Sequence, residues 1–243
     1  MTLAEILAGL FPQGHSVTVR DGLVTGGGPF AGETIHVVGI DGDTPLGVDG
    51  ALVLSRAVLD VVRAGDKAPI LVVVDSDSQR MSRRDELLGL NECLAHLAKA
   101  LLLADRSGHP TIGLIYGHSA AGAFIATALA TRVLAALPGA NPSVMDLPSV
   151  AKVTKLPLDK LQEMAKSTPV FAPGLDNMVA AGAVHVVLDS ARPLDGQIRD
   201  LIATLKPGDD RDHLGKVRGG RPVAQEIAQA VIAQALRGSR ESG

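Results

Sequence analysis

The stretch Thr111–Gly122, TIGLIYGHSAAG, decides the fold of this 243-residue chain. Its first half, Thr111–Tyr116, is a short apolar run with β-branched residues, which is typical of a strand buried on both faces of a parallel sheet. The second half, Gly117–Gly122, has small side chains that leave the backbone accessible. A helix that starts there has N–H groups without intrahelical partners, and such groups bind anions. The stretch therefore predicts an oxyanion-binding turn between a strand and a helix.

Two other interpretations of this turn stay open. Glycine and alanine also suit a tight packing turn that binds nothing. The segment Gly117–Ala121 is in addition close to the nucleophile elbow G-x-S-x-G of serine hydrolases, with Ala121 in place of the last glycine. Ser119 would then attack an ester or an amide. An acid and then a histidine must follow it in the chain, and the candidates are Asp176, Asp189, His185 and His213.

A second buried strand, Ile70–Asp75, precedes the first one in the chain. The polar loop after it, Ser76–Arg84, contains Ser78, Gln79 and Arg80. Because adjacent parallel strands end at the same edge of a sheet, we expect this loop beside the turn. A backbone N–H of Ser78 or Gln79 then supplies a second oxyanion donor. Arg80, together with Arg83 and Arg84 of the same loop, is a candidate to bind a carboxylate or an acidic carrier protein. Helix capping and plain solvation are the alternative roles of these residues.

Strands and helices alternate along the rest of the chain, so we expect one α/β domain over residues 1–243. Asp85–Ala104 has leucines at helical spacing and is expected to form one long helix. Gly26–Gly28, before a proline, predicts a loop, and Lys206–Arg221 predicts a mobile or partner-contacting loop. The other expected strands are Ser16–Arg20, Thr34–Ile40, Arg132–Leu137 and Val184–Leu188, and the other expected helices are Gly50–Arg63, Ala121–Ala130, Leu158–Lys166, Leu175–Ala181 and Pro222–Leu236.

The composition excludes several classes of protein. With a net charge of −3, 2% aromatic residues and no tryptophan, the chain has neither a basic field nor a stacking platform, so we expect no nucleic-acid partner. No two histidines have the spacing of metal ligands, so we expect no metal ion. The N-terminal segment differs from a signal peptide, and polar residues interrupt every long apolar run. The single Cys93 suits a reducing compartment, so we expect a cytoplasmic protein without a membrane segment.

The order of these features resembles the half-domain of biotin-dependent carboxyltransferases. In that family the first strand runs into Asp-Thr-Pro-Gly, and a later turn has the form Tyr-Gly-Gly-Ala. The corresponding positions here read Asp75-Ser76-Asp77-Ser78 and Ala120-Ala121-Gly122-Ala123. The stretches Arg132–Leu137, Asn141–Met145 and Ala180–His185 resemble further landmarks of the crotonase fold. Over nearly its full length, the chain is similar to the gamma subunits of biotin-independent malonate decarboxylase.

This resemblance implies a crotonase/ClpP-like α/β fold, with stacked β-sheets flanked by helices. It also implies a homologous beta subunit, with which the chain decarboxylates malonyl-S-acyl carrier protein to acetyl-S-acyl carrier protein and CO2. A separate transferase subunit reloads the carrier, and the phosphopantetheine-type arm belongs to the carrier. The chain itself is expected to bind no cofactor and no biotin, and to be active only with its beta partner. A non-catalytic scaffold subunit is the remaining alternative.

The resemblance also implies roles for single residues. The backbone donors that stabilise an enolate or a carboxylate are those of Ala121, Gly122, Ser78 and Gln79, and no side-chain nucleophile is required. The turn is expected to hold the leaving carboxylate, while the beta subunit holds the thioester oxygen. Independently of the resemblance, the position of His118 at the turn suits donation of a hydrogen bond to an anion or movement of a proton, and a structural histidine bonded to a neighbouring carbonyl is the more ordinary alternative. The implied substrate-binding residues are Gly117, His118, Ser119, Ala120 and Arg80.

Overall fold

The computed structural model describes residues 1–168, 172–206 and 208–241. Within them, eight strands form a sheet in the order β1-β2-β3-β4-β5-β6-β8, and β7 pairs with β5 beside this path. The strands are β1 (Thr18–Arg20), β2 (Leu23–Phe30), β3 (Glu33–Ile40), β4 (Ile70–Ser76), β5 (Thr111–Ala120), β6 (Val133–Ala136), β7 (Asn141–Ser143) and β8 (Val186–Val187). The helices are α1 (Leu3–Leu10), α2 (Val48–Ala64), α3 (Arg83–Leu87), α4 (Leu90–Arg106), α5 (Ala121–Ala126), α6 (Leu147–Thr154), α7 (Leu158–Ser167), α8 (Leu175–Ala180), α9 (Leu194–Ala203), α10 (Arg211–Val217) and α11 (Ala224–Glu241).

Strands β4 and β5 form the centre of the sheet. Ile70–Val74 pairs in parallel with Thr111–Ile115, and every residue of both segments is buried. β3 joins β4 in parallel, whereas β2 and β1 continue the sheet in antiparallel pairs. A strand that is covered on both faces needs apolar residues without alternation, which is why these two segments are continuous apolar runs. The α/β class and both central strands predicted from the sequence are confirmed.

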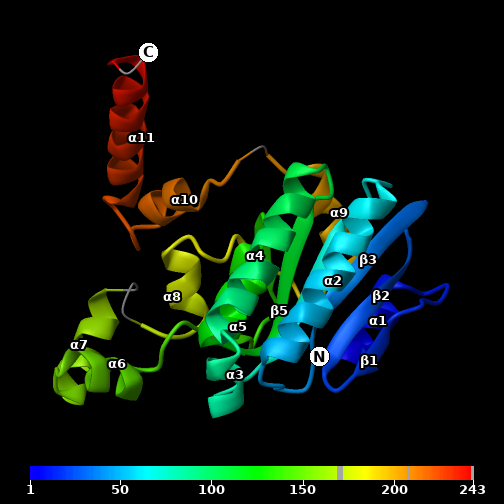
Figure 1. Cartoon of the computed structure of the whole chain (residues 1–243), viewed down its shortest axis with the longest axis horizontal. Helices are drawn as coiled ribbons and strands as arrows, with labels where there is room; N and C mark the ends of the chain where they lie inside the picture. The colour runs from blue at the N-terminus through cyan, green and yellow to red at the C-terminus, as the bar shows by residue number, and fades with distance from the viewer. Residues whose placement is uncertain (169–171, 207, 242–243) are drawn as a thin grey trace.

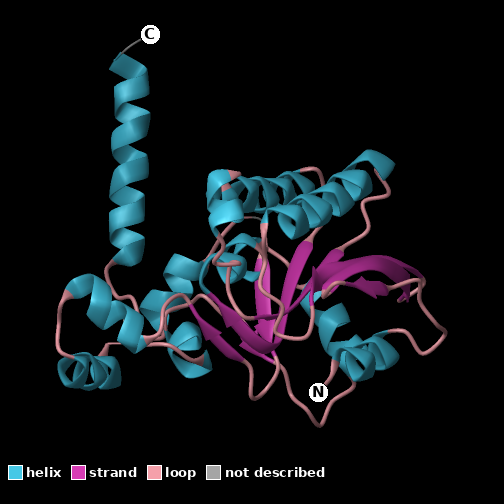
Figure 2. Cartoon of the chain, turned by 60° about the horizontal axis from the view of Figure 1, so that its bottom comes forward, coloured by secondary structure: helices cyan, strands magenta, loops and turns pink. Residues whose placement is uncertain are grey.

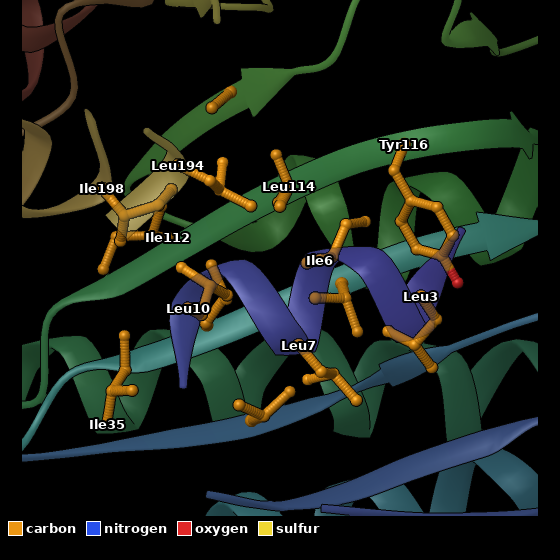
Figure 3. Packing of buried hydrophobic residues seen from close by; sticks show 14 of the residues in the cluster. Leu3, Ile6, Leu7, Leu10, Ile35, Ile112, Leu114, Tyr116, Leu194 and Ile198 are labelled. Carbon is orange, nitrogen blue, oxygen red and sulfur yellow. The ribbon is translucent and has the colours of Figure 1, made fainter. Parts of the chain in front are cut away.

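Helices cover both faces of this sheet (Figure 2). α2 and α4 lie side by side along one face (Figure 1), where Val58 and Leu101 share an apolar core with Val72 of β4. The other face is covered by α1 and α9. There Ile6, Leu10, Leu194 and Ile198 pack in one core with Leu114 of β5 (Figure 3). The sheet therefore buries both faces and leaves its edges and strand ends as places for a site.

Strand β5 pairs with two different strands on one side. Its segment Ile112–Ile115 pairs with β6, and its segment His118–Ala120 pairs with β7. The expected stacked sheets are thus one hydrogen-bonded sheet that branches near the end of β5. β5 also runs four residues past its predicted end at Tyr116, because β7 supplies pairing partners to residues that the sequence assigns to a turn.

Three of the expected elements are wrong. Gly26–Gly28 lies inside β2, where the glycines pair with Ile35–Val37 of β3 instead of forming a loop. The single helix expected over Asp85–Ala104 is two helices, because Gly89 has a left-handed backbone (φ 78°) between α3 and α4. The loop expected over Lys206–Arg221 contains α10, and Pro207 lies outside the described residues.

The other expected strands and helices have counterparts, but α1, α6, α9 and β7 were not among them. α1 begins at a capping box, in which Thr2 and Glu5 satisfy one another's backbone N–H groups. α6 begins after Asp146, whose carboxylate accepts the Ser149 N–H at 2.8 Å. Each of these starts has a local sequence signature for a helix. β7 has none, since its three residues include a proline.

The last helix, α11, differs from the others because it projects from the remainder of the molecule in both whole-chain views (Figures 1 and 2). Val223, just before it, and Ile227 and Val231 within it are 58%, 59% and 60% exposed. In the ranges that the structure describes, no helix has the length and apolar character needed to cross a membrane.

Candidate functional site

Two loops and the junction of β5 with α5 meet where the parallel strands β3, β4 and β5 end. The loop after β3 and the loop after β4 are joined by backbone hydrogen bonds, from Leu46 N–H to the Ser78 carbonyl and from Arg80 N–H to the Leu46 carbonyl, both 2.9 Å long. β5 ends beside them, with Ser119 in register with Ser76. This is the edge at which open α/β sheets place their sites. The sequence predicted that the loop after β4 and the turn at the end of β5 lie side by side, and the structure brings them together.

Asp75 fixes the end of β5. Its Oδ1 accepts the backbone N–H of His118 at 2.9 Å. A Cβ atom on Gly117 would collide with the same carboxylate, so only glycine lets the two strands approach here. Gly117 is therefore required by packing against Asp75, and this contact sets the position of the residues that follow it.

Ala121 is the first residue of α5 and has a left-handed backbone, with φ 48°. This conformation costs a residue with a Cβ atom roughly 1–2 kcal/mol, and glycine adopts it freely. The carboxyltransferase pattern has glycine at the corresponding position. The strained residue lies at the expected donor turn, and strain of this kind concentrates at functional sites.

Gly122 and Gln79 are joined by a hydrogen bond. The Gly122 N–H donates to Gln79 Oε1 at 2.8 Å, so the side-chain oxygen of Gln79 lies where the sequence predicts a ligand oxygen. A Cβ atom on Gly122 would lie 3.0 Å from that oxygen. The turn thus holds an acceptor oxygen at a backbone donor. Gln79 makes this contact through its side chain, whereas the sequence suggested a backbone N–H from this residue.

Ser119 lies in a setting that does not suit a nucleophile. It is fully buried within β5, and its Oγ has no hydrogen-bond partner among the described residues. The two histidines proposed for a triad are engaged elsewhere. His185 Nδ1 accepts the Leu134 N–H, and its Nε2 lies 3.3 Å from Asp210; His213 contacts Gln225. The geometry therefore does not support the serine-hydrolase interpretation.

Arg80 is held by a buried carboxylate. Its Nε and Nη2 donate to Asp85 at 2.6 and 2.9 Å, and Asp85 is fully buried. Asp85 also accepts the Val48 N–H at 3.0 Å and the Ser82 hydroxyl at 2.6 Å. Arg80, Ser82 and the Val48 N–H together hold the pKa of this carboxyl well below its usual range. In this structure Arg80 anchors the loop after β4, and its predicted role toward a substrate carboxylate stays a prediction.

We expect Asp85→Asn to lower the midpoint of thermal unfolding at pH 7 by several degrees, roughly 5 °C or more. A carboxyl with a lowered pKa stabilises the fold above its ordinary pKa, near 4, and loses this contribution as the pH falls toward the lowered value. The variant should therefore unfold with less dependence on pH below about 4. Circular dichroism melts from pH 7 to pH 2 measure both effects. Asp60→Asn, at an exposed ion pair of α2, is the control and should shift the midpoint little.

His118 lies in an acidic group that the histidine spacing could not reveal. Its Nδ1 is 3.0 Å from Asp43 Oδ1, and the potential ligand atoms of His118, Asp43 and Asp77 all lie within 4.8 Å of one another. Asp43 lies in the loop after β3, Asp77 in the loop after β4, and His118 near the end of β5. Beside them, the Tyr116 hydroxyl donates to Asp41 at 2.6 Å; burial, and then this carboxylate, raise the pKa of the tyrosine well above its usual value. Tyr116 is therefore held neutral, and the absence of a metal stays an expectation.

The fold and the loops at the strand ends define a protein of the crotonase-like carboxyltransferase class. One solved relative of this class is transcarboxylase 12S, with a TM-score of 0.67 and 18% identity; the match covers 85% of this chain and 42% of the relative. A Pseudomonas malonate decarboxylase MdcD-MdcE hetero-dimer has a TM-score of 0.73 with 24% identity, over 96% of this chain and 97% of the matched one. These likenesses establish the fold.

The family follows from the sequence match. Residues 42–235 match the model of the malonate decarboxylase gamma subunit, so the chain belongs to this family. It is also similar to the malonyl-S-ACP:biotin-protein carboxyltransferase MADD of Malonomonas rubra, with 28% identity over 202 residues, 75% of this chain and 69% of the relative. The family and the carboxyltransferase fold expected from the sequence are confirmed.

Proposed function

We propose that this chain is the gamma subunit of a cytoplasmic malonate decarboxylase that acts on malonyl-S-acyl carrier protein. Together with a homologous beta subunit, it would release CO2 and leave acetyl-S-acyl carrier protein. Membership of the family supports the complex. The observation that supports the site most directly is the Gly122 N–H, which already holds an amide oxygen at 2.8 Å. A backbone donor that holds one oxygen in this position can hold a substrate oxygen in the same way.

The chemistry needs polar donors and no nucleophile. The bond between the α-carbon and the malonyl carboxylate breaks, its electron pair forms a thioester enolate, and CO2 departs. A proton added to the α-carbon then gives the acetyl thioester. A donor on the thioester oxygen lowers the barrier because negative charge develops there, whereas a donor on the carboxylate orients the group that leaves. We assign the orienting role to the Gly117–Gly122 turn and the thioester oxygen to the beta subunit.

Neither the loss of CO2 nor the protonation of the enolate requires a cofactor bound by this chain. The phosphopantetheine-type arm would belong to the carrier protein, and a transferase subunit would reload the carrier with malonate. We propose that no biotin takes part. Ala121 and Ser78, which replace glycines of the biotin-dependent pattern, are consistent with the loss of a carboxybiotin site.

A transferase to biotin is the second candidate function, because the Malonomonas relative is by its name a carboxyltransferase to a biotin protein. The two candidates differ in the fate of the carboxyl group. A decarboxylase releases CO2 without an acceptor, and avidin leaves the rate unchanged. A transferase carboxylates a biotinylated carrier and needs it for turnover.

The test is co-expression of this chain with the beta subunit and the carrier, followed by purification of the complex. Incubation with malonyl-carrier protein should give CO2 and, by mass spectrometry of the carrier, an equal amount of the acetyl form. The same assay with avidin and with a biotinylated carrier separates the two candidates. An assembled complex that forms neither CO2 nor carboxybiotin would contradict both candidate functions.

A further inference from the structure

We propose that the Gln79 side chain is an internal ligand of the site, which occupies the Gly122 N–H when no substrate is bound and gives way to the substrate carboxylate. The contact is the 2.8 Å hydrogen bond from Gly122 N–H to Gln79 Oε1. The inference rests on the proposed function, since it assumes that Gly122 N–H is a substrate donor. It assigns to Gln79 a part in choosing between malonyl and acetyl groups.

A second glutamine in the same chain shows what a permanently held side chain looks like. Gln197 also accepts a backbone N–H at 2.8 Å, that of Asp189. Its Nε2 donates in addition to the carbonyls of Asp189 and Arg192 at 2.9 and 3.2 Å, and the residue is 6% exposed. Both ends of the Gln197 amide are therefore fixed inside the protein, as a structural role requires.

The amide of Gln79 is held at one end. Its Nε2 contacts only the Met81 sulfur, at 3.7 Å, among the described residues, and Met81 is 78% exposed. The side chain of Gln79 is half-buried and borders solvent. Rotation of Gln79 away from Gly122 thus breaks one strong hydrogen bond, and its amide finds water as a new partner. The same rotation of Gln197 would break three.

The competition favours a charged ligand. A hydrogen bond from an N–H to a carboxylate is roughly twice as strong as one to a neutral carbonyl such as that of Gln79. A malonyl carboxylate can therefore displace Gln79, whereas the acetyl product has lost its carboxylate and offers no oxygen there. The return of Gln79 to Gly122 then favours release of the product. The site therefore distinguishes malonyl from acetyl groups. Gln79 binds Gly122 N–H more weakly than the malonyl carboxylate does, and the acetyl group does not compete with it.

Two substitutions move this competition in opposite directions. Gln79→Ala removes the internal ligand, so the KM for malonyl-carrier protein should fall roughly 2- to 10-fold and inhibition by acetyl-carrier protein should increase. Gln79→Glu puts a carboxylate on Gly122, so KM at neutral pH should rise. Gln197→Ala is the matched control, because it removes the same kind of hydrogen bond far from the site and should leave KM unchanged.

A binding measurement keeps the inference separate from the proposed function. Calorimetric titration of the assembled complex with free malonate should show tighter binding to Gln79→Ala than to the natural protein, and weaker binding to Gln79→Glu. This titration needs no turnover. Absence of CO2 release would overturn the proposed function, and the malonate affinities would still test the role of Gln79. Equal or weaker malonate binding by a folded Gln79→Ala complex would overturn the inference.

Discussion

Replacement of Gly122 by valine should lower CO2 release from the assembled complex about 100-fold, because a misplacement of the reacting group by about 1 Å has a cost of this size. An added Cβ at this position lies 3.0 Å from Gln79 Oε1 and 3.1 Å from Leu94 Cδ1, so the neighbours must move even for alanine. The two further methyl groups of valine cover the space in front of the N–H. Initial rates of CO2 release from malonyl-carrier protein measure the effect.

Two further variants make this result specific. Gly196→Val is the matched control, because an added Cβ at Gly196 in α9 meets no atom within 4 Å. Both valine variants should elute with the beta subunit in size-exclusion chromatography, which separates loss of the site from loss of assembly. Ser119→Ala removes a hydroxyl that has no partner among the described residues and should keep most of the rate. A Gly122→Val complex within about fivefold of the natural rate would contradict the donor role.

The central part of the fold could be predicted because its signals are local. Ile70–Val74 and Thr111–Ile115 are continuous apolar runs, and a buried parallel strand leaves that signature in any sequence. The prediction of one helix over Asp85–Ala104 was wrong at a single residue, Gly89. Its left-handed backbone separates α3 from α4, although the leucines keep their helical spacing across it. The loop predicted at the glycines of β2 was wrong because these glycines do not break the strand. They are strand residues because the neighbouring backbone approaches closely, as the Ile35 carbonyl does at Gly27.

The sequence predicted where the candidate site lies in the fold, but it did not predict which side chains contact one another there. That two loops after adjacent strands meet follows from parallel topology, which the sequence indicates. The partner of Gly122 N–H is a side chain 43 residues earlier in the chain, and no spacing rule contains that contact. The group of Asp43, Asp77 and His118 also combines residues from two loops and the end of β5. The buried state of Ser119 depends on β7, whose Asn141-Pro142-Ser143 sequence gives no strand signal.

A second large effect is expected at α11. Ile227 and Val231 are four residues apart and so lie on one side of the helix, Val223 comes just before its first turn, and each of the three is more than half exposed. Ala228 and Ile232 of α11, by contrast, line a cavity of about 640 Å³ against the body of the molecule. Ile232 is itself 59% exposed, so the apolar side chains of α11 are only partly covered by its own chain. An exposed apolar stripe on a projecting helix marks an interaction surface, and the proposed beta subunit is the occupant that we assign to it.

Substitution of Ile227 and Val231 together by aspartate should weaken the association with the beta subunit at least about 1,000-fold, because two buried aliphatic side chains contribute roughly 4 kcal/mol and the carboxylates add a desolvation penalty. Gln229→Asp with Ala233→Asp adds the same two charges to the other side of α11 and should leave the association nearly unchanged. Co-purification and the dissociation constant of the two subunits measure both. CO2 release should be lost together with association, since the two halves of the proposed site lie on different chains. A variant that stays folded and still binds the beta subunit would show that this side of α11 has another occupant.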